Sequence, residues 1–235
     1  MKIFSRLLPA AFALCSLTGC ETAQQVLNGM NTGSGALSSA EIAAGLKEAL
    51  SIGTQNSNAK LSALDGFFGN AAIKILMPEE AQKVESTLRN IGLGSLVDKA
   101  VLSMNRAAED AAKSATPIFV NAIKQMTITD AVGILKGGDY AATDYFKTKT
   151  TEPLTNAFRP VIEKALTKVD ATKYWNDVFS AYNKFAAKPI NTDLAGYVTE
   201  KSLAGIFHEG GQEEQKIRKD PAARVTELLK KVFGS

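Results

Sequence analysis

From Ser38 onward, apolar residues recur at the three- and four-residue spacing of an α-helix, and short breaks separate the runs. Ser38 and Glu41 match a capping box, in which each side chain accepts a hydrogen bond from the other's backbone N–H at a helix start. Proline or paired glycines mark many of the breaks, as at Pro78 and Gly137–Gly138. No hairpin pattern stands out. The spacing therefore predicts an all-α fold, one compact domain of about ten helices over residues 38–235.

Some of these breaks predict where individual helices end. Residues 139–148 and 151–168 are expected to be separate helices, the second kinked at Pro160, because proline has no N–H to donate. Gly210 and Gly211 predict another break, since each glycine costs a helix about 1 kcal/mol. That break would place His208 at a helix end, where the dipole favours a positive charge.

Residues 64–77 (LDGFFGNAAIKILM) fit neither a helix nor a sheet. Gly66 and Gly69 interrupt any long helix, and Asp65-Gly66 is typical of a turn. The segment IKIL at 73–76 alternates like a short strand, but no partner strand is visible nearby. We expect an irregular connection here.

The first twenty residues have the pattern of a bacterial export signal. Lys2 and Arg6 precede an apolar run at residues 7–17. This run is shorter than the about 20 residues needed to cross a bilayer. The sequence LTGC at 17–20 then resembles a lipobox, in which small residues precede the cut and the cysteine thiol receives a diacylglycerol. We predict that residues 1–19 form a lipoprotein signal peptide and that Cys20 is the lipidation site.

Residues 20–37 then predict a lipidated cysteine and a flexible tether, because they are rich in Gly, Ser, Thr and Asn. Several acyl chains would anchor the chain to a membrane durably. We therefore expect a lipid-anchored protein on the periplasmic face of the cell envelope. Glu21 stands where an Asp would retain a lipoprotein at the inner membrane, which favours the outer membrane.

The residue counts exclude several kinds of site. The chain has one histidine and two cysteines. Cys15 would leave with the signal peptide and Cys20 would become a thioether, so no thiol would remain for a disulfide or a metal. We expect no metal and no cofactor. Loss of Lys2 and Arg6 lowers the net charge from +3 to +1, so no nucleic-acid partner is expected.

Five polar residues form the candidate cluster: Asp65, Lys74, Asn105, Arg106 and Glu109. Asn105 and Glu109 lie one helical turn apart, and the alanines between them would let a neighbouring helix approach closely. The cluster either forms a structural network or faces a pocket, and Asp65 either shapes a turn or acts as an acid. None of these residues is assigned a catalytic role.

Several short segments carry a resemblance to a family: GLKEAL (45–50), DGFF (65–68), IKI (73–75), NRAAE (105–109), AATDYF (141–146), YVTEK (197–201) and IRKDPAAR (217–224). Over residues 40–233 the chain resembles the bacterial domain-of-unknown-function 4197 family. The resemblance implies an exported, helical protein of Gram-negative bacteria, often a lipoprotein. It carries over no catalytic residue.

Three functions remain open. The first is a non-enzymatic, lipid-anchored envelope protein that binds a partner protein or an apolar ligand. The aromatic residues at 174–185 are either core or one wall of such a ligand pocket. The second is an enzyme that uses carboxylates, with Asp65, Arg106 and Glu109 in one cleft. The third is a purely structural envelope factor.

Replacement of the predicted lipidation residue tests the export signal. Cys20→Ala should leave an uncleaved precursor without lipid, because no thiol is present to accept the diacylglycerol. Immunoblotting and metabolic labelling with a radioactive fatty acid measure both steps. Cys15→Ala, within the apolar run, should be processed normally. A lipidated product of mature size from Cys20→Ala would contradict the prediction.

Overall fold

The structure is a computed structural model that describes residues 37–168, 170–184, 189 and 192–233. Its contacts separate Met1–Leu37 from a compact unit, Ser38–Ser235. The predicted signal peptide, Cys20 and residues 21–36 of the predicted tether lie outside the described residues. The fold below is that of the compact unit.

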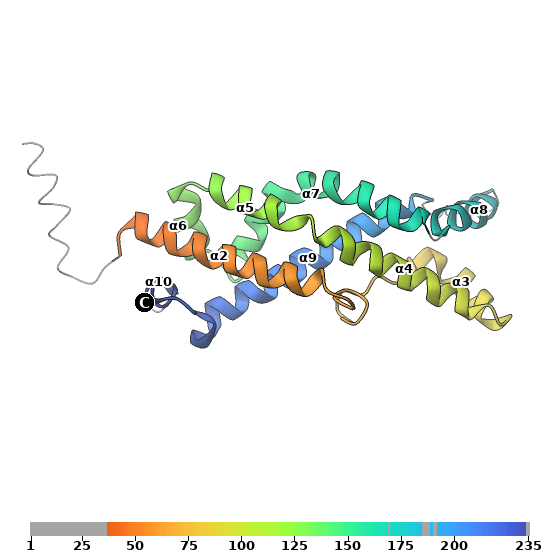
Figure 1. The fold of residues 1–235 in the computed structure, drawn as a ribbon, viewed down its shortest axis with the longest axis horizontal. Helices are drawn as coiled ribbons and strands as arrows, with labels where there is room; N and C mark the ends of the chain where they lie inside the picture. The colour runs from red at the N-terminus through yellow and green to blue at the C-terminus, as the bar shows by residue number, and fades with distance from the viewer. Residues whose placement is uncertain (1–36, 169, 185–188, 190–191, 234–235) are drawn as a thin grey trace, which may run out of the picture. The chain divides into compact units, whose positions relative to one another are not determined.

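The described residues form nine α-helices and two 3₁₀ turns and contain no strand (Figure 1). The all-α prediction is therefore confirmed. In chain order the elements are α2 (Ser39–Leu61), η1 (Glu79–Ala81), α3 (Gln82–Asn90), α4 (Gly94–Ala112), α5 (Ala115–Gln125), α6 (Ile128–Lys136), α7 (Ala141–Thr167), α8 (Ala171–Asn183), α9 (Leu194–Lys219), η2 (Pro221–Ala223) and α10 (Glu227–Phe233).

The predicted capping box begins α2. The Glu41 N–H donates to Ser38 Oγ at 3.2 Å, and the Ser38 N–H donates to the Glu41 carboxylate at 2.8 Å. The Ser38 hydroxyl also donates to this carboxylate at 2.8 Å, and the two hydrogen bonds from the Ser38 N–H and hydroxyl favour the charged form and lower the pKa of Glu41. The helix continues to Leu61, beyond its regular apolar spacing, because small residues on its later turns are buried against other helices.

The prediction of two helices between residues 139 and 168 is wrong, because α7 is one helix that contains both Pro153 and Pro160. Each proline removes one backbone hydrogen bond, but both rings lie on the exposed side of the helix. Buried side chains recur every four residues, so the buried stripe turns about the axis by about 40° per step. Different parts of this stripe allow the helix to pack on α9, α4 and α5. The stripe consists of Ala142, Phe146, Thr150, Leu154, Phe158, Ile162 and Leu166.

The predicted break at Gly210 and Gly211 is also wrong, because α9 runs through both residues. Gly211 is buried, and a Cβ atom added there would lie 3.2 Å from the Tyr140 ring. Close packing of the helix on this ring therefore offsets the low helix propensity of glycine. His208 consequently lies in the interior of α9, exposed to solvent, and has no helix-end role.

The largest hydrophobic cluster joins residues from α4, α5, α7, α8 and α9 with three residues of the connection that follows α2. Trp175 and Phe179 of α8 belong to it, with ring centroids 4.4 Å apart and exposures of 6% and 2%. Of the aromatic residues at 174–185, these two therefore belong to the hydrophobic core.

Within the described residues, no single helix has the length and apolar character that a membrane span requires. The pair α5 and α6 passes the same test of length and composition only when taken together, and the two helices meet at 104°.

Two helix glycines make a matched test of packing. A Cβ atom at Gly205 would lie 2.5 Å from Cε1 of Phe67, whose ring is fully buried, whereas one at Gly53 would lie 3.6 Å from Ile217. Gly205→Ala should destabilise the fold by about 1–3 kcal/mol through overpacking. Gly53→Ala should be neutral or stabilise it by up to about 1 kcal/mol, through helix propensity. Urea denaturation measures both, and equal effects would contradict this account.

Candidate functional site

A loop of residues 62–78 connects α2 to η1 and carries two of the five predicted cluster residues. A connection of this length without regular structure is uncommon in a compact domain and is usually functional. It places Phe67, Ile73 and Ile75 in the core, with exposures of 0%, 8% and 2%. Its backbone N–H and C=O groups therefore need partners, which neighbouring strands would otherwise supply.

The predicted turn at Asp65-Gly66 is confirmed. Asp65 has a positive φ of 65°, a conformation that aspartate tolerates better than most residues. Gly66 lies so close to the end of α2 that an added Cβ atom would collide with the carbonyl oxygens of Lys60 and Leu61. The dipeptide thus turns the chain sharply at the end of α2.

Asn105 of α4 takes the place of a partner strand. The Ile75 N–H donates to Asn105 Oδ1 at 2.9 Å, and Asn105 Nδ2 donates to the Ile75 carbonyl at 2.8 Å and to the Val101 carbonyl at 2.7 Å. Asn105 itself is fully buried. One side-chain amide therefore satisfies both backbone groups of an extended residue, which explains how the IKIL segment lies without a sheet.

Glu109, one turn further along α4, holds the other half of the loop. Its Oε1 accepts hydrogen bonds from the Phe67 and Phe68 N–H groups, each at 3.1 Å. Its Oε2 accepts from Arg106 Nη1 at 2.6 Å, and its side chain is 6% exposed. Three donors thus provide hydrogen-bond partners for this carboxylate in a buried position.

Arg106 joins this carboxylate to the turn. Its Nη2 lies 2.7 Å from Asp65 Oδ1, and hydrogen bonds to Glu109 and then to Asp65 raise the pKa of Arg106. Lys74 Nζ lies 3.8 Å from the centroid of the Phe68 ring, which is a cation–π contact. The structure thus brings Asp65, Arg106 and Glu109 into direct contact and places Lys74 beside them.

Helix α9 holds the loop from a second side. Glu209 accepts hydrogen bonds from Asn70 Nδ2 and from Lys60 Nζ, each at 2.6 Å. The Tyr197 hydroxyl donates to the Leu76 carbonyl at 2.9 Å, and burial raises the pKa of Tyr197 to about 12, so the donor keeps its proton at neutral pH. Sequence reasoning did not identify either contact.

Glu214 of α9 accepts hydrogen bonds from the first turn of α7. The N-cap residue of α7, Tyr140, provides no side-chain cap of its own. The Ala142 N–H donates to Oε1 and the Thr143 N–H to Oε2, each at 2.9 Å, and Arg218 pairs with Oε1 at 2.8 Å. The unsuitable residue at the N-cap position was the signal that an acceptor from elsewhere was needed.

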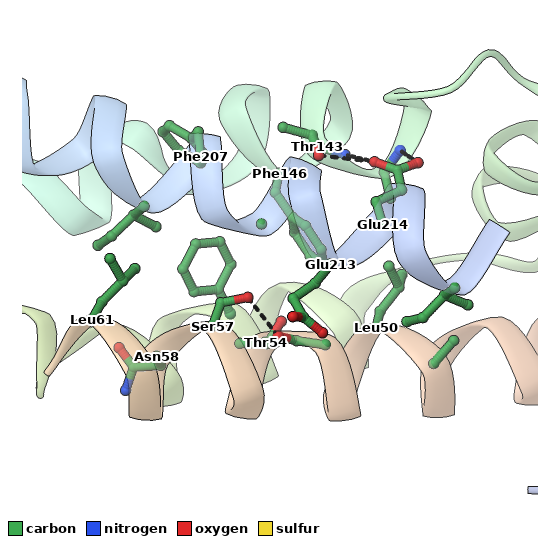
Figure 2. Close-up of a pocket in the computed structure, with 17 residues that line it drawn as sticks. Leu50, Thr54, Ser57, Asn58, Leu61, Thr143, Phe146, Phe207, Glu213 and Glu214 are labelled. Carbon is green, nitrogen blue, oxygen red and sulfur yellow. Dashed lines mark hydrogen bonds between the residues drawn. The ribbon is translucent and has the colours of Figure 1, made fainter. Parts of the chain in front are cut away.

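The α2–α9 crevice is an apolar hollow between these two helices, completed by α5 and α7 (Figure 2). It has a volume of about 60 Å³. Its lining spans α2 from Ala49 to Leu61, about 18 Å along the helix axis. It is therefore long and narrow. The lining residues are Ala49, Leu50, Gly53, Thr54, Ser57, Asn58, Leu61, Phe119, Ala142, Thr143, Phe146, Ile206, Phe207, Gly210, Glu213, Glu214 and Ile217.

The C-terminal helix borders one end of this crevice. A second hollow of about 20 Å³ shares Ala49, Leu50 and Ile217 with the crevice and is also lined by Phe233. Leu229 and Val232 of α10 are buried, with exposures of 0% and 4%. The last helix therefore covers the continuation of the crevice along α2.

The family model described as "Protein of unknown function (DUF4197)" matches residues 36–234. The chain belongs to this family. Neither a curated protein nor a solved structure matches it. In this family member, the match spans the 62–78 loop, the polar cluster and the crevice.

The crevice of this DUF4197 protein was not predicted from the sequence. Ala49, Gly53 and Ser57 recur every four residues and thus lie on one face of α2, where their small side chains leave space beside α9. That spacing is the signal that could have found it. Among the described residues, no group of three or more His, Cys, Asp or Glu side chains could hold a metal ion.

The hydrogen bonds of Asn105 predict that replacing its amide nitrogen by an oxygen atom will lower the stability of the fold strongly. Asn105→Asp should destabilise this family member by about 3 kcal/mol or more, because a buried carboxylate would face two carbonyl oxygens. The reverse change on the same helix, Asp110→Asn, should cost under about 1 kcal/mol, because its pair with Lys113 is exposed. Urea denaturation at neutral pH measures both. A similar cost for the two variants would show that Asn105 does not hold the loop.

Proposed function

We propose that this chain is a lipid-anchored protein on the periplasmic face of the cell envelope, and that its helical domain binds an apolar ligand in the α2–α9 crevice without catalysing a reaction. The export-signal pattern of residues 1–20, which ends in the LTGC sequence at 17–20, supports the anchor and the location. The observation that carries the binding function is the apolar crevice itself.

The crevice walls favour a hydrocarbon ligand. Side chains such as Leu50, Phe146 and Phe207 line a hollow that has few polar atoms (Figure 2). Moving apolar surface from water into such a site contributes about 25 cal/mol per Å². Preformed apolar hollows with a few polar groups are the usual form of a small-molecule site.

The dimensions of the crevice restrict the shape of that ligand. Its volume of about 60 Å³ is less than half of the about 150 Å³ of an engineered cavity that holds benzene. A ring therefore does not fit, whereas an extended alkyl chain can lie along the about 18 Å of α2 if the walls part slightly. Phe233 and α10 lie where such a chain would continue, so displacement of this short helix would lengthen the site.

The state of the buried carboxylates supports binding over catalysis. Glu109, Glu209 and Glu214 each accept hydrogen bonds from two or more donors of the fold. A general acid or base must exchange a proton with a substrate within hydrogen-bond reach. Each of these three carboxylates would have to give up contacts that hold the loop or a helix start.

A slender, uncharged fluorescent polyene tests the proposed site. The chain from Glu21 onward, which keeps the whole compact unit, should bind the methyl ester of cis-parinaric acid at one molecule per chain, with fluorescence that rises and saturates. Gly53→Leu should weaken this binding at least tenfold, because the added side chain enters the crevice between Ile217 and Glu213.

Gly133→Leu is the matched control, since an added Cβ atom at this exposed position of α6 meets no atom within 4 Å. Its binding should equal that of the unmodified chain. No saturable binding, or the same loss in both variants, would overturn the proposed ligand site.

A further inference from the structure

Glu213 lines the crevice, and its carboxylate has no hydrogen bond to any of the residues that the structure describes. Its side chain is 20% exposed and extends from α9 toward Thr54 of α2 (Figure 2). Its contact with a cation is Lys216 Nζ at 3.8 Å, and that lysine is 58% exposed. No hydrogen bond joins the carboxylate to any described residue. Its acceptor positions therefore remain available inside an apolar hollow.

Three glutamates among the described residues are buried, and they differ from the partly exposed Glu213. The side chains of Glu109, Glu209 and Glu214 are 6%, 4% and 7% exposed, and all three accept hydrogen bonds at 3.1 Å or less. Each also pairs with a cation at 2.8 Å or less. A cation therefore pairs closely with each of these three carboxylates, whereas the cation nearest to Glu213 lies 3.8 Å away.

The charges around the crevice have one sign. Its lining contains two acidic residues, Glu213 and Glu214, and no basic residue. Arg218 pairs with Glu214 at 2.8 Å, whereas Glu213 has only the looser ion pair with the exposed Lys216 at 3.8 Å. The Glu213 carboxylate is partly exposed and has no hydrogen-bond donor among the described residues, so a cation that enters the crevice beside it would be stabilised.

We propose that the crevice is specific for a single-chain amphiphile with a protonated amine head group. The ammonium donates to the Glu213 carboxylate and to the Thr54 hydroxyl, and the alkyl chain lies against the apolar walls. This inference rests on the proposed function and adds the head-group chemistry of the ligand to it. An ammonium has three donors and no acceptor, which complements a site whose uncommitted groups are oxygen atoms.

Three probes with the same tail separate the head group from the chain. Calorimetric titration of the chain from Glu21 onward, below the micelle-forming concentration, compares dodecylamine, dodecanol and dodecanoate at neutral pH. Dodecylamine should bind at least tenfold more tightly than dodecanol, and dodecanoate should bind more weakly than both, because its charge repels Glu213.

Glu213→Gln keeps the size of the side chain and removes its charge. It should reduce the affinity for dodecylamine to that for dodecanol and leave dodecanol binding unchanged. Glu200→Gln, on an exposed position of the same helix, is the matched control and should preserve the preference for the amine.

The outcomes distinguish this inference from the proposed function. If dodecylamine and dodecanol bind equally, or if Glu213→Gln keeps the preference for the amine, the head-group assignment is overturned and the apolar site stands. If none of the three probes binds, both are overturned.

Discussion

The 62–78 loop can lie inside a helical domain because side chains of α4, together with Tyr197 of α9, provide hydrogen-bond partners for its buried backbone. An irregular segment that buries three apolar side chains also brings its N–H and C=O groups out of water, and each unpaired group would be costly. Asn105 satisfies both groups of Ile75, and Glu109 satisfies the N–H groups of Phe67 and Phe68. The side chains of one helix thus do what neighbouring strands do in a sheet. The position of the loop, and through Phe67 the close approach of Gly205, depends on these contacts.

The same use of buried glutamates recurs in α9. Glu209 binds the loop, and Glu214 caps the first turn of α7, which has no cap of its own. These contacts account for the continuity of α9 through two glycines, because both glutamates must lie at fixed positions on one helix. They also provide the comparison that makes Glu213 of the crevice stand out. Against a background of carboxylates that are fully occupied, Glu213 is the one in the crevice whose oxygen atoms remain without a hydrogen-bond donor among the described residues.

Local sequence signals predicted the structure correctly where neighbouring residues decide it. The capping box at Ser38, the turn at Asp65-Gly66 and the helical spacing that defines the fold class all depend on residues within a few positions of one another. The predictions failed at the break expected between residues 148 and 151, in a helix that also contains two prolines, and at Gly210–Gly211, where intrinsic propensity opposes a helix. Burial of a long apolar stripe on α7, and the packing of Gly211 on Tyr140, outweigh a local cost of a few kcal/mol.

The sequence by itself determined that this chain is helical and that it resembles a family whose model matches residues 36–234. The first follows from the spacing of apolar residues, and the second from the short segments that carry the resemblance. Only the tertiary structure decided what the cluster does and where the crevice lies. Which donor meets which carboxylate depends on the packing of helices that are distant in sequence: Glu109 meets Phe67 across 42 positions, and Glu214 meets Ala142 across 72. A glutamate whose carboxylate accepts hydrogen bonds and one whose carboxylate does not look the same in a sequence. The difference lies in the donors that folding brings next to them.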